Sequence, residues 1–195
     1  GKTLSVMVDQ FVHLHYPEVT VVPLAGGMGR NPEILSNQIA SKMALQLDGQ
    51  CFLLHAPAFT VSSAERDIFL NNPAINDTVK KGELADIAIL GLGDLRHSTI
   101  RKQEYITPEE IEELEKMGAV GDIALQFIDK NGRIVPHDIH KRLVASDLQK
   151  VRAHAREVIG IAAGNYKIPI IRAALQGNWL DVFITDAETA EALLQ

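Results

Sequence analysis

The sequence predicts an α/β fold in which helices cover both faces of a mainly parallel sheet. Two observations support this class: short apolar stretches bounded by glycine, proline or aspartate, and helical patterns that alternate with them along the chain. Parallel strands need such crossover helices, and strands buried on both faces are continuously apolar. In sheets of this kind, ligands bind where the loops gather at the carboxyl ends of the strands.

Composition excludes several classes of protein. The 195 residues are enough for one domain with a substantial core, and 46% of them are hydrophobic. The net charge of −6 argues against a duplex-binding module, which normally has a basic face. No apolar run approaches the roughly 20 residues that span a bilayer, no signal peptide is visible, and Cys51 has no cysteine to pair with. We therefore expect a single cytoplasmic domain over residues 1–195, without a membrane partner.

The chain opens with a helix, a strand and a second helix. Residues Thr3 to Tyr16 carry apolar side chains at helical spacing, and the β-branched run Val19–Leu24 is typical of a strand. Asn31 and Pro32 fit the cap and the first position of a helix that ends near Asp48 and Gly49.

A glycine loop joins that strand to the second helix. Gly26, Gly27 and Gly29 let the backbone adopt positive φ and come close to a ligand. The N–H groups and the positive dipole end of the following helix then favour an anion. A phosphate-binding loop and a tight βα turn without a ligand both fit this pattern, and the loop alone does not separate them.

The next elements repeat this order. Cys51–Leu54 predicts a strand that Pro57 stops, Ser62 or Ser63 can cap a short helix, and Pro73 begins another. Asp86–Leu90 predicts a third strand that runs into a second glycine loop containing Gly91 and Gly93.

The middle of the chain holds a loop, a helix and a turn. The segment from Asp94 to Tyr105 has no clear period, so we expect a loop or lid. Thr107–Glu110 has the cap, proline and carboxylates of a helix start, and that helix ends at Gly118. A turn signal inside Gln126–Ile134 predicts a β-hairpin.

The last third returns to strands and helices. We expect Ser146 to cap a short helix, Val158–Ala162 to form a strand, and Gly177 to stop the helix that follows it. Asp181–Thr185 predicts the last strand, and Asp186 can cap the closing helix. The whole pattern predicts a Rossmann-like three-layer domain with a small β-hairpin.

Known cofactor motifs do not fit. Gly27-Met28-Gly29 lacks the third glycine of the dinucleotide fingerprint, the second strand leads to His55 instead of an acid, and no Walker lysine follows. One cysteine and seven scattered histidines give no zinc spacing, and we interpret His137 and His140, in a stretch that looks extended, as structural. We expect no cofactor and no metal.

Asp122 and Lys167 are charged residues in segments otherwise made of small or apolar residues. A carboxylate can accept sugar hydroxyls, and an ammonium can meet a phosphate. Alternatively, Asp122 caps a helix and Lys167 is a solvated residue of a first helical turn. The pattern leaves both interpretations open.

Six segments in order resemble one family over essentially the whole chain. They are VVPLAGGMGRN, HAPA, DIAILGLG, GAVGDIALQFIDKNG, IGIAAGNYKIPIIRAAL and VFITDAETAEALL. This series resembles the effector-binding domain of SorC-family bacterial transcriptional regulators. The resemblance implies a fold like that of sugar-phosphate isomerases. It also implies a preceding helix-turn-helix DNA-binding region. This chain contains no such region, and that absence fits its abrupt start at Gly1.

The resemblance also implies a site for a phosphorylated sugar. Its residues would be Gly26, Gly27, Met28, Gly29, Arg30, Ala58, Phe59, Gly93, Asp122, Asn165 and Lys167. In this scheme the first glycine loop holds one end of the ligand, Asp122 contacts the sugar and Lys167 contacts phosphate. Two departures stand out: Ala163-Gly164 replaces the paired glycines that usually precede the lysine, and His55 replaces an aliphatic residue, which suggests a changed sugar preference.

These features lead to one main hypothesis and two alternatives. The main hypothesis is an allosteric domain that binds a phosphorylated sugar and controls operator DNA through a homo-oligomer, dimer or tetramer, with DNA bound only by the helix-turn-helix region. The first alternative is a sugar-phosphate isomerase or deaminase, for which Asp122 could be the base but no matching His or Glu is evident. The second is an oligomerisation module with a vestigial pocket.

Overall fold

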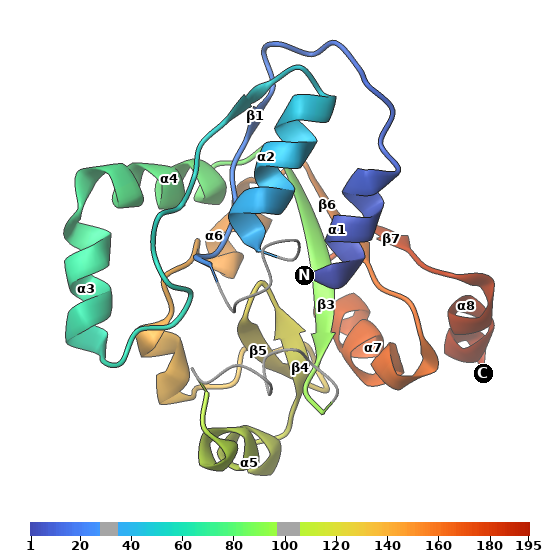
Figure 1. Ribbon diagram of the computed structural model, residues 1–195. Coiled ribbons are helices and arrows are strands. Elements are labelled where there is room, and N and C mark those ends of the chain that lie inside the picture. Colours follow the sequence, from blue (N-terminus) through green and yellow to red (C-terminus); the bar gives the residue numbers. More distant parts are fainter. Residues whose placement is uncertain (28–34, 97–105) are drawn as a thin grey trace. The chain divides into compact units, whose positions relative to one another are not determined.

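The computed structural model describes residues 1–27, 35–96 and 106–195 (Figure 1). The chain folds into two compact units, one made of Gly1–Ala85 and Lys141–Val151, the other of Asp86–His140 and Arg152–Gln195. Each unit is therefore built from two separate segments of chain. At two of the points where the chain passes from one unit to the other, it does so inside a helix. No stretch with the composition of a linker therefore marks those points in the sequence. The sequence predicts one domain over residues 1–195, which would comprise both units. This stays a prediction.

The first unit contains one small parallel sheet and four α-helices lying wholly within it, among its described residues. These elements are α1 (Lys2–Asp9), β1 (Thr20–Val21), α2 (Ser36–Gln46), β2 (Gln50–Cys51), α3 (Ser63–Asn71) and α4 (Pro73–Glu83). β1 and β2 pair in parallel, with Thr20 opposite Gln50. The predicted first helix is too long, because α1 ends at Asp9 and the chain up to Tyr16 is not helical.

The core of the first unit gathers around α4. Leu54, Ile75, Val79 and Val144 form a buried apolar cluster, to which α4 contributes Ile75 and Val79. The predicted helix starts of this region are confirmed as well: the Ser62 side chain accepts a hydrogen bond from the Glu65 backbone N–H at the start of α3, and Pro73 begins α4, which Asn72 caps.

The second unit is organised around a five-stranded sheet. Its strands are β3 (Ile87–Asp94), β4 (Ala119–Ile123), β5 (Gln126–Asp129), β6 (Glu157–Ile161) and β7 (Val182–Ile184). Its helices are α5 (Pro108–Lys116), the 3-10 turn η4 (Asn165–Lys167), α7 (Ile168–Gln176) and α8 (Ala187–Leu194). Two further helices, η3 (Asp138–Arg142) and α6 (Leu148–His154), each contain a point at which the chain passes from one unit to the other.

The sheet of the second unit is mixed. Its order is β5-β4-β3-β6-β7, in which β3, β6 and β7 run parallel whereas β4 is antiparallel to both β3 and β5. The α/β class is confirmed, but the predicted mainly parallel sheet is corrected to a partly parallel one. α7 packs against β3, β4 and β5. Whether helices cover both faces in three layers stays a prediction.

The antiparallel part depends on a tight turn that the sequence does not signal. Ala124 and Leu125, which join β4 to β5, both have positive φ, at 49° and 67°. Hairpin turns of this kind normally use Asn-Gly or Asp-Gly. Here the Leu125 backbone N–H donates to Asp122 Oδ2 at 3.0 Å, and this hydrogen bond supports the unusual backbone.

The predicted hairpin over Gln126–Ile134 is present in reduced form. Gly132 takes a φ of 77° in its turn, and Asp129 Oδ1 accepts hydrogen bonds from two backbone N–H groups, those of Asn131 and Arg133. β5 is regular, but the return strand is a single bridge between Ile128 and Ile134. The turn prediction is confirmed and the second strand is not.

Three further predictions about helix starts have different outcomes. Thr107 and Glu110 form a reciprocal capping box at α5, and Asp186 accepts the Thr189 backbone N–H at α8, both as predicted. Ser146 is not a cap, because its hydroxyl donates to the Val79 carbonyl oxygen while Asp147 accepts the Gln149 backbone N–H at the start of α6.

Candidate functional site

Asp122 and Gly93 lie directly opposite each other on β4 and β3. A Cβ atom on residue 93 would lie 2.0 Å from Asp122 Oδ1, so only glycine leaves room for this carboxylate. Gly91 and Gly93 were expected in a loop after the third strand, but β3 continues through both of them to Asp94. Glycine is therefore needed at position 93 because it leaves space for the Asp122 side chain within the sheet, and not because a loop needs a flexible residue there.

The Asp122 carboxyl group is buried, with 6% of the residue exposed. Burial raises the pKa of Asp122 from 3.8 to about 6, because the charged form loses its hydration. The hydrogen bond from the Leu125 N–H and the positive charge of Lys167 lower this pKa, whereas the charge of Asp94 raises it. The alternative in which Asp122 caps a helix is wrong, since the residue lies within a strand.

Lys167 is the last residue of η4 and immediately precedes α7. Its side chain is half-buried, and its ammonium lies 6.0 Å from the centroid of the Tyr166 ring. Burial lowers the pKa of Lys167, and the carboxylates of Asp122 and Asp94 oppose that shift. The structure thus brings Lys167 into the electrostatic reach of two buried acids, which a fully solvated residue would not have.

The loop before Lys167 is held by the first turn of α8. Asn165 is exposed, and its Nδ2 donates to Glu188 Oε1 at 2.8 Å. The Gly164 backbone N–H donates to Thr189 Oγ1 at 2.8 Å. Gly164 has a φ of 105°, which strongly favours glycine, so the second residue of the Ala163-Gly164 pair keeps the glycine that this backbone needs.

Four predicted site residues belong to the first unit and lie close together there. The backbone N–H groups of Gly26 and Gly27 donate to the carbonyl oxygens of Val144 and Ala56, at 3.0 and 2.9 Å. They are therefore engaged within the unit and are not free to bind an anion. The Ala58 N–H donates in turn to the Gly27 carbonyl oxygen.

The side chains of Ala58 and Phe59 are packed in the interior, at 1% and 2% exposure. Only their backbone could line a pocket, so Phe59 contributes to the core more than to a ligand surface. Met28, Gly29 and Arg30, which complete the predicted glycine loop, lie outside the described residues. The same holds for residues 97–105 of the predicted lid.

His137 and His140 have structural partners. His137 immediately precedes η3 and His140 lies within it, whereas an extended stretch was predicted for both residues. His140 Nε2 accepts the Phe127 backbone N–H at 3.0 Å, and burial, followed by the charge of His137, lowers the pKa of His140 to about 4. His137 Nδ1 accepts the Ile139 backbone N–H, and its Nε2 lies 3.0 Å from Glu113 Oε2.

The described part of the chain holds neither a cluster of metal-ligating side chains nor a membrane-spanning helix. Across residues 1–27, 35–96 and 106–195, no three His, Cys, Asp or Glu side chains are grouped to hold a metal ion. No helix in those ranges has the length and apolar character to span a bilayer.

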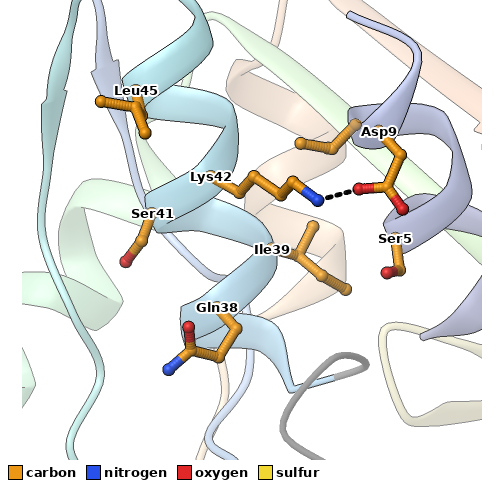
Figure 2. Close-up of a pocket in the computed structure, with 8 residues that line it drawn as sticks. Ser5, Asp9, Gln38, Ile39, Ser41, Lys42 and Leu45 are labelled. Carbon is orange, nitrogen blue, oxygen red and sulfur yellow. Dashed lines mark hydrogen bonds and ion pairs between the residues drawn. The ribbon is translucent and has the colours of Figure 1, made fainter.

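A separate pocket of about 500 Å³ lies between α1 and α2 in the first unit. Figure 2 shows the Lys42 side chain reaching from α2 to form an ion pair with Asp9 of α1. Ser5, Gln38 and Ser41 add polar groups to its lining. None of the predicted site residues that the structure describes lines this pocket.

The family assignment rests on the whole chain. A family model described as a putative sugar-binding domain matches residues 1–195. The chain belongs to this family. The resemblance to effector-binding domains of SorC-family transcriptional regulators is thereby confirmed.

Curated relatives are longer than this chain. The transcriptional regulator LsrR of Klebsiella pneumoniae is 32% identical over 183 residues, which cover 91% of this chain and 54% of the relative. The erythritol catabolism regulatory protein EryD of Brucella abortus is 25% identical over 195 residues, or 100% of this chain and 61% of the relative. The chain therefore spans little more than half the length of these regulators.

Solved structures give the same assignment. The full-length sorbitol operon regulator SorC of Klebsiella pneumoniae matches with a TM-score of 0.90 and 25% identity, covering 100% of this chain and 64% of that one. A DeoR family regulator of Listeria monocytogenes matches with a TM-score of 0.91 and 27% identity, covering 99% and 76%.

The predicted site residues thus fall into two groups, one in each unit. Gly93, Asp122 and Lys167 are brought together in the second unit, with Asn165 in the loop before the lysine. Their ligand contacts stay predictions. Asp94 was missed, although an acid that ends a long apolar strand is a signal that could have identified it.

Proposed function

We propose that this chain is the effector-binding domain of a sugar-responsive transcriptional regulator and that its effector is a phosphorylated sugar. The relatives named as LsrR, EryD and sorbitol operon regulator support the regulatory part. The observation that carries the chemical part is that half-buried Lys167 lies within electrostatic reach of buried Asp122. A carboxylate accepts hydroxyl hydrogen bonds, and an ammonium stabilises a phosphate.

The geometry gives each residue a role in this proposal. Asp122 Oδ2 is engaged with the Leu125 N–H, so Oδ1, which lies against Gly93, is the oxygen that accepts a sugar hydroxyl. Lys167 binds the phosphate, and its partial burial strengthens that attraction. Ligand contacts of the first-unit residues Gly26, Gly27, Ala58 and Phe59 stay predictions.

Regulation requires the effector to favour one arrangement of an assembly. We infer a homo-oligomer that binds operator DNA through a helix-turn-helix region in the full-length protein. The coupling free energy of such systems is ~1–3 kcal/mol, and it comes only from contacts that differ between two states.

A thermal-shift screen tests the proposal directly. The panel contains hexose 6-phosphates, pentose 5-phosphates and a hexose bisphosphate, with the parent sugars and inorganic phosphate as controls. A ligand at about a hundred times its Kd adds ~2.7 kcal/mol to the free energy of unfolding. We expect a shift with a sugar phosphate and not with its parent sugar.

Matched variants locate the binding. Lys167→Gln and Asp122→Asn should lose the shift, whereas Lys130→Gln, a change of the same charge at an exposed turn of the same unit, should keep it. A normal shift in Lys167→Gln would overturn the phosphate assignment. The absence of any shift across the panel would overturn the proposed ligand class.

One observation favours a second candidate function, a sugar-phosphate isomerase or deaminase. The pKa of Asp122 at about 6 suits a general base or acid near neutral pH. Incubating the protein with ketose and aldose phosphates, and with amino-sugar phosphates, would reveal interconversion or ammonia release. Turnover that disappears in Asp122→Asn would establish the enzyme, and unchanged substrates would leave the regulator as the function.

A further inference from the structure

Thr189, in the first turn of α8, is bonded to the loop that leads to Lys167. The residue is fully buried, and its hydroxyl oxygen accepts the Gly164 backbone N–H at 2.8 Å. The carbonyl oxygen of the same glycine accepts the Lys167 backbone N–H at 2.9 Å. A single residue, Gly164, is therefore hydrogen-bonded both to the Thr189 hydroxyl and to the backbone of Lys167.

The Thr189 hydroxyl is itself fixed by Asp186. It donates to Asp186 Oδ2 at 2.9 Å, while the Thr189 backbone N–H donates to Oδ1 at 2.8 Å. These two hydrogen bonds, the backbone one first, hold the pKa of Asp186 below its usual value, so the carboxylate stays ionised and accepts both. Because the hydroxyl proton is directed at Asp186, the oxygen lone pairs are left for the Gly164 N–H.

The backbone of Gly164 needs such support. Its φ of 105° and ψ of 136° form an uncommon conformation, which persists only where the surrounding structure holds it. A Cβ atom on residue 164 would lie 2.7 Å from Cε1 of Tyr166, so that ring lies directly against the glycine. The Lys167 ammonium is 6.0 Å from the centroid of the same ring. The conformation of Gly164 thus governs both the backbone and the aromatic neighbour of the lysine.

α8 is anchored at its other end as well. It lies beside α7, and Arg172 Nη2 of α7 donates to the carbonyl oxygen of Ala192 near the end of α8, at 3.4 Å (Figure 1). α7 begins directly after Lys167. The loop is therefore held on one side by the helix that follows it and on the other by the first turn of α8.

We propose that Thr189 is a positioning residue for an anion at Lys167: its hydroxyl fixes the loop that carries the lysine, and the first turn of α8 responds when the anion binds. This inference rests on the proposed function, because it takes Lys167 as the residue that binds the phosphate of the effector. A loop that is already fixed loses less conformational entropy on binding. By reciprocity, a bound anion strengthens the hold of Thr189 on Gly164.

The first experiment needs no effector. Thr189→Val removes the hydroxyl at nearly constant volume, and Thr189→Ser keeps it. NMR measures the exchange of the Gly164 and Lys167 amides with solvent, relative to the amides of β6, which report on the stability of the unit. We expect this relative exchange to become about tenfold faster in Thr189→Val, the size expected for the loss of a buried hydrogen bond, and to stay near the wild-type rate in Thr189→Ser.

Thr185→Val is the matched control, because it makes the same chemical change four residues earlier. Thr185 Oγ1 is buried and has no hydrogen-bond partner within the part of the chain that the structure describes. This variant should leave the exchange of the Gly164 and Lys167 amides unchanged. Equal acceleration in Thr185→Val, or none in Thr189→Val, would overturn the inference.

The second experiment uses the panel member with the largest thermal shift. Calorimetry measures its Kd at a temperature at which every variant is folded, and denaturation measures the free energy of unfolding of each variant. We expect the Kd to rise about tenfold in Thr189→Val, to recover in Thr189→Ser and to be unchanged in Thr185→Val. In the wild type, the ligand should slow the exchange of the Gly164 amide.

The two readouts separate positioning from simple stabilisation. A Thr189→Val protein that is less stable but has the wild-type Kd would show a purely structural role for Thr189; this would overturn the inference and leave the proposed function intact. If no panel member binds to the wild type, the proposed function itself is rejected and this inference with it.

Discussion

Among single residues, Gly93 and Asp122 show how packing and charge are joined in one contact. The carboxylate occupies the space that a Cβ atom of residue 93 would need, and it is held there by the Leu125 N–H. The same burial that fixes its position makes its charge unfavourable. Stability and the proposed ligand chemistry therefore depend on the same atoms.

Replacing Gly93 by alanine should displace this carboxylate. The added Cβ would meet Asp122 Oδ1 at 2.0 Å, and we expect the free energy of unfolding to fall by about 1–3 kcal/mol. Chemical denaturation of Gly93→Ala, Asp122→Ala and the double variant measures this. The alanine at 93 should cost much less when Asp122 is already absent, and equal costs in both backgrounds would contradict the packing argument.

The pH dependence of stability gives a second residue-level prediction. Because the pKa of Asp122 is raised from 3.8 to about 6, the folded state holds more protons than the unfolded state between these values. Its contribution to stability is present at low pH and is lost as pH rises through about 6, by up to about 3 kcal/mol.

Asp122→Asn keeps an acceptor for the Leu125 N–H and removes the titration. We expect it to be more stable than the wild type at pH 7 and similar to it at pH 4. Urea denaturation from pH 4 to 7.5 tests this, and a difference that does not change with pH would refute the assignment. His140 acts in the opposite direction in both proteins, since its pKa is lowered to about 4, so the comparison must be between variants.

Among helices and strands, local signals were the most reliable guides. The cap at Thr107, the proline at the start of α4 and the aspartate before α8 act within a few residues of the chain, and all three are confirmed. The sequence analysis did not predict β4. Its pairing with β3 joins segments that the hydrophobic pattern does not relate to each other, and the Ala124-Leu125 turn lacks the usual turn residues. The extension of β3 through two glycines was missed for the same reason.

The capping box of α5 provides an element-level prediction. Thr107→Ala removes the side-chain oxygen that accepts the Glu110 N–H and should lower the free energy of unfolding by about 0.5–2 kcal/mol. Thr107→Ser keeps that oxygen and should stay close to the wild type. Denaturation midpoints of the two variants measure the difference, and equal losses would show that the methyl group, not the cap, matters.

On the scale of the whole molecule, the chain builds two compact units from interleaved segments. The predicted site residues are divided between them, with the acid–lysine cluster in one unit and the Gly26–Gly27 backbone in the other. In the first unit these glycine N–H groups already have carbonyl partners. The two groups should therefore respond differently to an effector.

Hydrogen exchange can separate these responses. The Gly26 and Gly27 amides, bonded to the Val144 and Ala56 carbonyl oxygens, should exchange slowly before any sugar phosphate is added and change little afterwards. The Leu125 amide, bonded to Asp122, should exchange more slowly once a sugar phosphate binds. Fast exchange at Gly26 and Gly27 that slows only with ligand would instead identify them as a phosphate-binding backbone.

The sequence by itself determined the α/β class, the family, most helix starts and the pairing of Asp122 with Lys167 as candidates. These depend on periodicity, on caps and on ordered motifs, which are local properties of the chain. Only the tertiary structure decided that Gly93 lies in a strand against Asp122, that the Gly26 and Gly27 N–H groups are already bonded, and that Asp94 is a buried acid at the end of β3. Those facts depend on strand register and burial, which arise from contacts between segments far apart in the sequence.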